Sequence, residues 1–124
     1  MGVTSMKKMF AMLAAIASLS TSAAFAHAML ETASPRVGAR VAASPGEISL
    51  TFSERVEAGL STISLHAEGG EEVLLSAAAI GASGHVLVAK IGRALEPGRY
   101  IVKWTVLSAD GHTTAGDYSF TVAK

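Results

Sequence analysis

The chain has 124 residues, ten basic and ten acidic side chains, and no cysteine. The neutral balance, with lysines and arginines scattered along the chain, argues against a nucleic-acid-binding function that depends on phosphate contacts. The absence of cysteine excludes thiolate zinc sites, thiol nucleophiles and blue-copper centres.

Residues 1–26 are predicted to be a secretory signal peptide. Two lysines precede a short, alanine-rich apolar segment, and Ala24 and Ala26 fit the A-x-A cleavage pattern. The apolar segment is too short to span a membrane, which takes about 20 residues. We therefore expect export to the periplasm and a mature domain of residues 27–124 whose first residue is His27.

Cleavage after residue 26 would remove two of the ten basic residues and leave 98 residues with a net charge of −2. A chain of this length forms one small domain. Without disulfides, its stability must come from packing. We expect this domain to be a monomer with no nucleic-acid partner.

Beyond His27 the sequence alternates apolar and polar residues in short stretches that are separated by Gly, Pro and Ser, a pattern typical of half-buried strands. Residues 36–43 are predicted to be a loop or weak strand, and residues 76–84 and 108–115 to be loops or turns. Strands are predicted over residues 28–32, 47–53, 61–67, 72–75, 85–91, 99–107 and 116–122.

The two strands nearest the C-terminus carry the strongest pattern. Large apolar residues occupy alternate positions and are predicted to meet in the core of a hairpin: Tyr100, Val102, Trp104 and Val106 on one strand, Tyr118, Phe120 and Val122 on the other. About seven short strands separated by turns indicate an all-β protein, a small immunoglobulin-like sandwich.

The loop between these two strands contains a candidate metal ligand pair, Asp110 and His112. In an extended segment, residues i and i+2 point to the same side. A mature N-terminal His27 would add an amine and an imidazole, so that the three residues offer three nitrogens and one oxygen. Cu(II) prefers tetragonal sites of N and O ligands, and the sequence therefore predicts a Cu(II) site.

Simpler interpretations exist for each part of this site. Asp110 and Gly111 could form an ordinary turn, with His112 a solvated loop residue. An Asp-x-His pair alone is weak evidence, but together with a histidine exposed by cleavage it is much more specific.

With these residues the chain resembles the CopC copper-binding proteins of the bacterial periplasm. The resemblance covers essentially the whole mature chain, and its specificity depends on the N-terminal histidine and the Asp-x-His pair. The matching pieces are His27-Ala28-x-Leu30, Ser34-Pro35, Gly38, Leu50-x-Phe52-Ser53-Glu54, Pro97-Gly98-x-Tyr100-x-Val102-x-Trp104, Ser108-x-Asp110-x-His112 and Phe120-x-Val122.

The resemblance implies a seven-stranded Greek-key β-barrel or sandwich. It also implies one Cu(II) per chain, held by a histidine brace at His27 and completed by Asp110 and His112, with Glu54 near the N-terminal amine. Such a protein would be a copper carrier or buffer and not an enzyme. It would deliver copper to a partner such as a CopD-type importer of the inner membrane or another periplasmic copper protein.

Some members of that family hold Cu(I) in a methionine-rich loop, but residues 65–80 contain no methionine. We therefore expect the Cu(II) site only. Met29, the one methionine of the mature chain, is expected to pack in the core although it lies two residues from His27. His66 and His85 are expected to be surface histidines at strand ends.

Two other function classes stay open. A lytic polysaccharide monooxygenase also uses a histidine brace, but it needs an open copper position, which Asp110 would fill. A metal-free sandwich module for adhesion or structure is the third possibility. Copper titration of the processed protein distinguishes the three.

Overall fold

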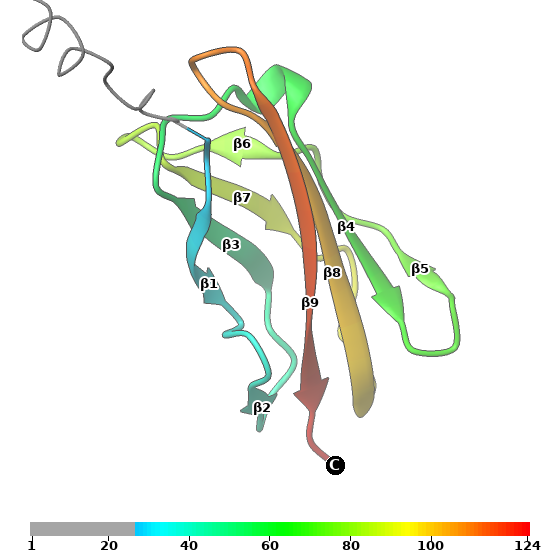
Figure 1. Cartoon of the computed structure of the whole chain (residues 1–124). Coiled ribbons are helices and arrows are strands. Elements are labelled where there is room, and N and C mark those ends of the chain that lie inside the picture. Colours follow the sequence, from blue (N-terminus) through cyan, green and yellow to red (C-terminus); the bar gives the residue numbers. More distant parts are fainter. Residues whose placement is uncertain (1–26) are drawn as a thin grey trace, which may run out of the picture.

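The structure is a computed structural model that describes residues 27–124 (Figure 1). The predicted signal peptide, residues 1–26, lies outside the described residues. Within the described part, no helix has the length and apolar character needed to cross a bilayer.

The described residues form two β-sheets packed face to face, as the sequence predicted for an all-β sandwich (Figure 1). One sheet has the strand order β1-β3-β7-β6 and the other the order β2-β9-β8-β4-β5. The bounds are β1 Leu30–Ser34, β2 Arg40–Val41, β3 Glu47–Phe52, β4 Thr62–Ala67, β5 Glu72–Val73, β6 Ala79–Ile80, β7 Val86–Lys90, β8 Gly98–Leu107 and β9 Thr113–Val122, with a short 3-10 helix, η2, at Ala58–Leu60.

The connections give the sandwich its Greek-key character. The chain passes from the first sheet to the second between β1 and β2, between β3 and β4, and between β7 and β8. Consecutive strands such as β3 and β4 therefore lie in different sheets, whereas the β8–β9 hairpin stays within one sheet. Side chains from both sheets fill one core.

Two sequence predictions were wrong in detail. The segment 76–84, predicted to be a loop, contains β6, which pairs with β7 through Ala79 and Ile80. Strand β9 begins at Thr113, three residues earlier than predicted, because Thr113 and Thr114 pair with the end of β8. Backbone pairing with a neighbouring strand extends these segments although their own apolar pattern is weak. The loop after β8 is therefore short.

The β8–β9 hairpin forms the central part of the core, as predicted. Tyr100 pairs with Phe120 in register, and the two rings stack with centroids 5.7 Å apart. Trp104 is buried and meets Phe52 of the other sheet edge to face, at 5.2 Å between centroids. The contact between Trp104 and Phe52 joins the two sheets, and the Tyr100–Phe120 stack packs within one of them.

Gly116 lies opposite Trp104 in the β8–β9 pairing. A Cβ atom at Gly116 would lie 2.5 Å from Cζ2 of the Trp104 ring. The indole therefore occupies the space that any larger residue at position 116 would need.

Candidate metal centre

The first three described residues lie between the two sheets and are hydrogen-bonded to both. On one side, the N–H of Met29 donates to Oγ of Ser53 at 2.9 Å, and its carbonyl accepts from the Ser53 N–H at 2.8 Å. The same Ser53 hydroxyl lies 3.4 Å from the carbonyl of His27. On the other side, the carbonyl of Ala28 accepts from the Thr114 hydroxyl of β9 at 2.8 Å. The segment is therefore fixed at the edge of the sandwich.

This hydrogen-bond pattern alternates from residue to residue, as in an extended strand. Ala28 accordingly points into the core and is 1% exposed, whereas Met29 is 67% exposed. The prediction that Met29 packs in the core is therefore wrong: its neighbour takes the buried position, and period-two alternation directs Met29 outward.

The loop after β8 is closed by its own backbone. The N–H of Ser108 donates to the carbonyl of His112 at 2.9 Å, and the N–H of Gly111 donates to the carbonyl of Ser108 at 2.9 Å. Gly111 has a φ of +90°, a conformation that suits glycine because it has no Cβ. The turn brings Asp110 back over Ser108 and His112.

The Asp110 carboxylate is held by the residues of this loop. Its Oδ1 atom is hydrogen-bonded to the hydroxyl of Ser108, which is 1% exposed, and accepts the backbone N–H of His112 at 3.1 Å. These two hydrogen bonds, the Ser108 bond foremost, lower the pKa of the Asp110 carboxyl from 3.8 to about 2. The carboxylate therefore stays ionised at any pH near neutrality.

Two imidazoles and this carboxylate come together at one end of the sandwich. The rings of His27 and His112 lie with centroids 4.8 Å apart and an interplanar angle of 77°. Oδ2 of Asp110 lies 3.1 Å from Nδ1 of His112, whose side chain is 59% exposed. That contact orients the His112 ring and leaves its Nε2 atom for a ligand, since histidines that bind metals usually have the other ring nitrogen hydrogen-bonded.

The positions of these side chains meet some of the requirements of a metal site and not others. Metal–nitrogen bonds are about 2.0–2.1 Å long, so two ligand nitrogens must approach within about 4 Å, which rings 4.8 Å apart can do by small rotations. Among residues 27–124, however, no three His, Cys, Asp or Glu side chains already form a group that could hold a metal ion. Asp110 faces His112, and in the chain described here the His27 nitrogen is a peptide amide joined to residue 26.

Three further residues carry side chains that can bind a metal: Glu54, His66 and His85. Glu54 directly follows Ser53 and is half-buried, and its role near the amine stays a prediction. His85 is half-buried before β7, and its Nδ1 atom lies 3.1 Å from the carbonyl of Phe52. His66 is half-buried within β4, with an enclosed Nδ1 atom. Both histidines lie at or beside a strand end, as expected from the sequence, and both are half-buried.

No role was predicted from the sequence for Ser53, Ser108 and Thr114. They are the hydroxyl residues that hold the N-terminal segment and the Asp110 loop in place. Their positions in the sequence could have indicated these roles, because each residue lies just beyond or at the end of a strand that borders the predicted ligands.

Comparisons with known proteins show the family to which the chain is related. The CopC domain family matches residues 30–123. Protein YobA of Escherichia coli (strain K12) is 39% identical over 106 residues, which are 85% of this chain and 86% of YobA. Copper resistance protein C of Xanthomonas campestris pv. juglandis is 35% identical over 112 residues, 86% and 87% of the two chains. The crystal structure of CopC from Methylosinus trichosporium OB3b is 39% identical, with a TM-score of 0.74 over 78% of this chain and 94% of that chain.

Proposed function

The chain belongs to the CopC family, and from this premise we propose that it is a periplasmic protein that sequesters Cu(II) and delivers it to a partner. Membership places the chain among copper-binding proteins of the resistance and transport class, not among enzymes. The proposed compartment follows from the signal-peptide pattern of residues 1–26.

In this proposal one Cu(II) is held by the amine and imidazole of His27, the imidazole of His112 and the carboxylate of Asp110. The observation that carries it is the 4.8 Å approach of two histidine rings from opposite ends of the mature sequence. Nitrogen and carboxylate donors suit Cu(II). The Asp110–His112 contact occupies only one lone pair of Oδ2, and an ionised carboxylate offers about four acceptor positions, so Asp110 remains able to bind the metal.

The position of the site supports delivery to another protein. The His112 side chain is 59% exposed and the Asp110 side chain 30% exposed, so copper bound here would lie at the surface. A partner could then replace the ligands one at a time without unfolding the sandwich. We propose a copper-accepting protein of the periplasm or inner membrane, such as a CopD-type importer.

The decisive experiment changes only the N-terminus. Protein that begins with His27 is compared with protein that carries one extra glycine before His27, which converts the amine into an amide. We expect Cu(II) affinity, measured by competition with a chelator of known affinity, to be at least about 100-fold lower in the extended form, because loss of even a supporting group costs about 10–100-fold.

The control is the extended protein after enzymatic removal of its extra glycine, which should regain the affinity of the protein that begins with His27. Equal affinities of the extended and processed forms would refute the histidine brace. Binding by neither form would favour a metal-free sandwich module instead.

A further inference from the structure

We propose that Met29 gives the same site a second binding mode, in which its thioether joins the imidazoles of His27 and His112 to hold Cu(I). The inference rests on the proposed function, because it uses the same two histidines. It adds a sulfur ligand and a second oxidation state to that site, and no second metal position.

The backbone of residues 27–29 determines where the thioether can lie. Ser53 is hydrogen-bonded to residues 27 and 29 on one side, and Thr114 to residue 28 on the other. This alternation means that the side chains of His27 and Met29 leave the same face of the segment, about 6.6 Å apart along it at ~3.3 Å per residue. The flexible methionine side chain can span that distance.

Packing does not explain the position of Met29. Its side chain is 67% exposed, although both backbone polar groups of the residue are fixed by Ser53. An apolar side chain held firmly at the surface gains little from burial. Met29 is also the only methionine in residues 27–124, so the one thioether of the mature chain lies two residues from a proposed copper ligand.

The two oxidation states of copper prefer different ligands. Thioethers are soft ligands that select Cu(I), whereas amine, imidazole and carboxylate donors suit Cu(II). Two imidazoles and one thioether therefore form a Cu(I) set, and exchanging Asp110 and the amine for Met29 converts one set into the other. Both modes use the His27 and His112 rings, so only one copper ion binds at a time.

The experiment uses processed protein that begins with His27 and carries a 13C-labelled methionine methyl group. Residues 27–124 hold a single methionine, so the spectrum shows one methyl signal, and Cu(I) is diamagnetic. We expect this signal to shift on anaerobic addition of Cu(I) and to stop shifting at one equivalent. A methyl signal that does not move when Cu(I) binds would overturn the proposal.

The matched variant is Met29→Leu, which keeps the size and apolar character of the side chain but removes the sulfur. Because loss of a supporting group lowers metal affinity about 10–100-fold, we expect at least a tenfold loss of Cu(I) affinity. Cu(II) affinity and the Cu(II) electron paramagnetic resonance spectrum should stay at parental values. Unchanged Cu(I) affinity in Met29→Leu would refute the Met29 mode while leaving the Cu(II) site intact.

If the proposed Cu(II) site itself is wrong, the result differs from a failure of the Met29 mode. In that case the processed parent would bind Cu(II) weakly, and His112→Ala would not weaken it further. The Cu(II) arm with the parent and His112→Ala therefore tests the site, and the Cu(I) arm with Met29→Leu tests the thioether.

Discussion

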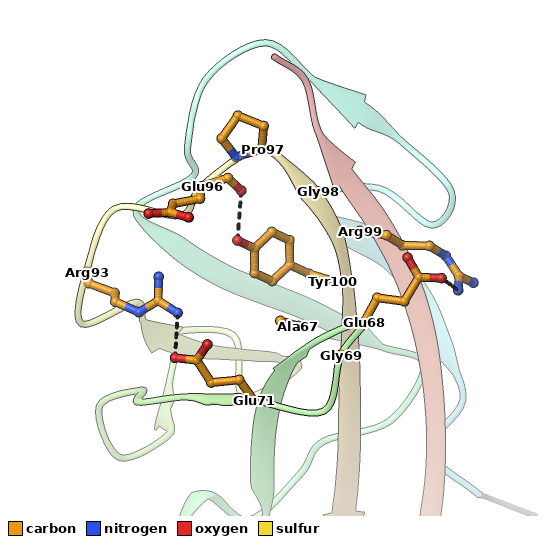
Figure 2. Close-up of a pocket in the computed structure, with 10 residues that line it drawn as sticks. All are labelled: Ala67, Glu68, Gly69, Glu71, Arg93, Glu96, Pro97, Gly98, Arg99 and Tyr100. Atoms are coloured by element: carbon orange, nitrogen blue, oxygen red, sulfur yellow. Dashed lines mark hydrogen bonds and ion pairs between the residues drawn. The ribbon is translucent and has the colours of Figure 1, made fainter.

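The two ends of strand β8 carry polar clusters with opposite properties. At the Leu107 end, the next loop brings His112 to His27 and Asp110 to His112. At the Gly98 end lies a hollow of about 290 Å³, lined by charged residues and by Tyr100 (Figure 2). The second end has a hollow lined by charged groups, whereas the first end has the donors that suit a metal ion.

Each of the two arginines that line the hollow is paired with a glutamate. Arg93 lies 3.4 Å from Glu71, and Arg99 lies 3.4 Å from Glu68 (Figure 2). The hydroxyl of Tyr100 donates to the carbonyl of Glu96 at 2.7 Å. Both positive charges are thus neutralised by glutamates, and no histidine lines this hollow.

At the other end the contacts orient donors without using all of them. The carboxylate of Asp110 is fixed by Ser108 and keeps its charge, while the exposed ring of His112 keeps one nitrogen for a ligand. The comparison teaches that a site for a small cation is recognised by oriented donors and not by an enclosed volume.

The largest expected effect comes from removing a proposed ligand at the Leu107 end of β8. Removing a charge at the Gly98 end is the control. His112→Ala should lower Cu(II) affinity at least about 100-fold, since it removes a proposed direct ligand and loss of supporting groups alone costs about 10–100-fold. Glu71→Gln, at the hollow, should leave Cu(II) affinity unchanged. Both affinities are measured by chelator competition. Equal losses in the two variants would contradict the distinction between the ends.

The pH dependence of the same measurements separates the two loop ligands. Copper must displace a proton from each imidazole that it binds, so His112→Ala should also reduce the steepness with which affinity falls from pH 7 to pH 5. Asp110→Asn should weaken binding but keep the parental steepness, because the pKa of Asp110 is about 2 and this carboxylate carries no proton in that range. A parental slope in His112→Ala would remove His112 from the ligand set.

The next prediction concerns the core that connects the two ends of β8. Gly116→Ala places a Cβ atom 2.5 Å from the Trp104 ring. Overpacking of this kind costs about 1–3 kcal/mol, so the free energy of unfolding should fall by that amount. Denaturant unfolding followed by the fluorescence of Trp104, the only tryptophan, measures the change.

The matched control is Gly46→Ala. Nothing lies within 4 Å of a Cβ atom at Gly46, so its unfolding midpoint should stay close to that of the parent. If Gly116→Ala unfolds at the same midpoint as Gly46→Ala, the close packing of Trp104 against position 116 is wrong.

Sequence patterns predicted the core well, because burial imposes period two on long strands. The alternate residues of β3, β8 and β9 are buried as predicted, from Ile48 to Val122. The failures have a common physical cause. Strand β6 and the first residues of β9 are stabilised by pairing with a neighbouring strand, and such pairing leaves little trace in the local composition.

The candidate site was predictable as a set of residues but not as a geometry. The approach of His27 to His112 follows from a resemblance and from ligand chemistry, and the structure brings the two rings together. The roles of Ser53 and Ser108 depend on tertiary contacts that no sequence spacing reveals. The exposure of Met29 was mispredicted because one apolar residue beside Ala28 does not show which of the two faces the core.

The smallest expected effect tests how the Asp110 loop is organised. Ser108→Ala removes the hydrogen bond that contributes most to the low pKa of Asp110, so this pKa should rise from about 2 toward 3.8. A carboxylate with a depressed pKa stabilises the folded state above its ordinary pKa, and this stabilisation is lost as the pH falls through the folded-state pKa. In Ser108→Ala the loss should therefore occur at a higher pH than in the parent.

The measurement is an NMR titration of the Asp110 carboxyl carbon in metal-free protein, in the parent and in Ser108→Ala. Cu(II) affinity should fall only about tenfold, because Ser108 supports a proposed ligand and is not one itself.

Ser119→Ala is the matched control. It removes a hydroxyl that accepts a hydrogen bond from Arg99 at 3.1 Å, toward the opposite end of the hairpin, and should leave Asp110 unchanged. If Asp110 titrates at the parental pH in Ser108→Ala, the hydroxyl does not hold the carboxylate, and the orientation of Asp110 must come from the backbone N–H and the imidazole of His112.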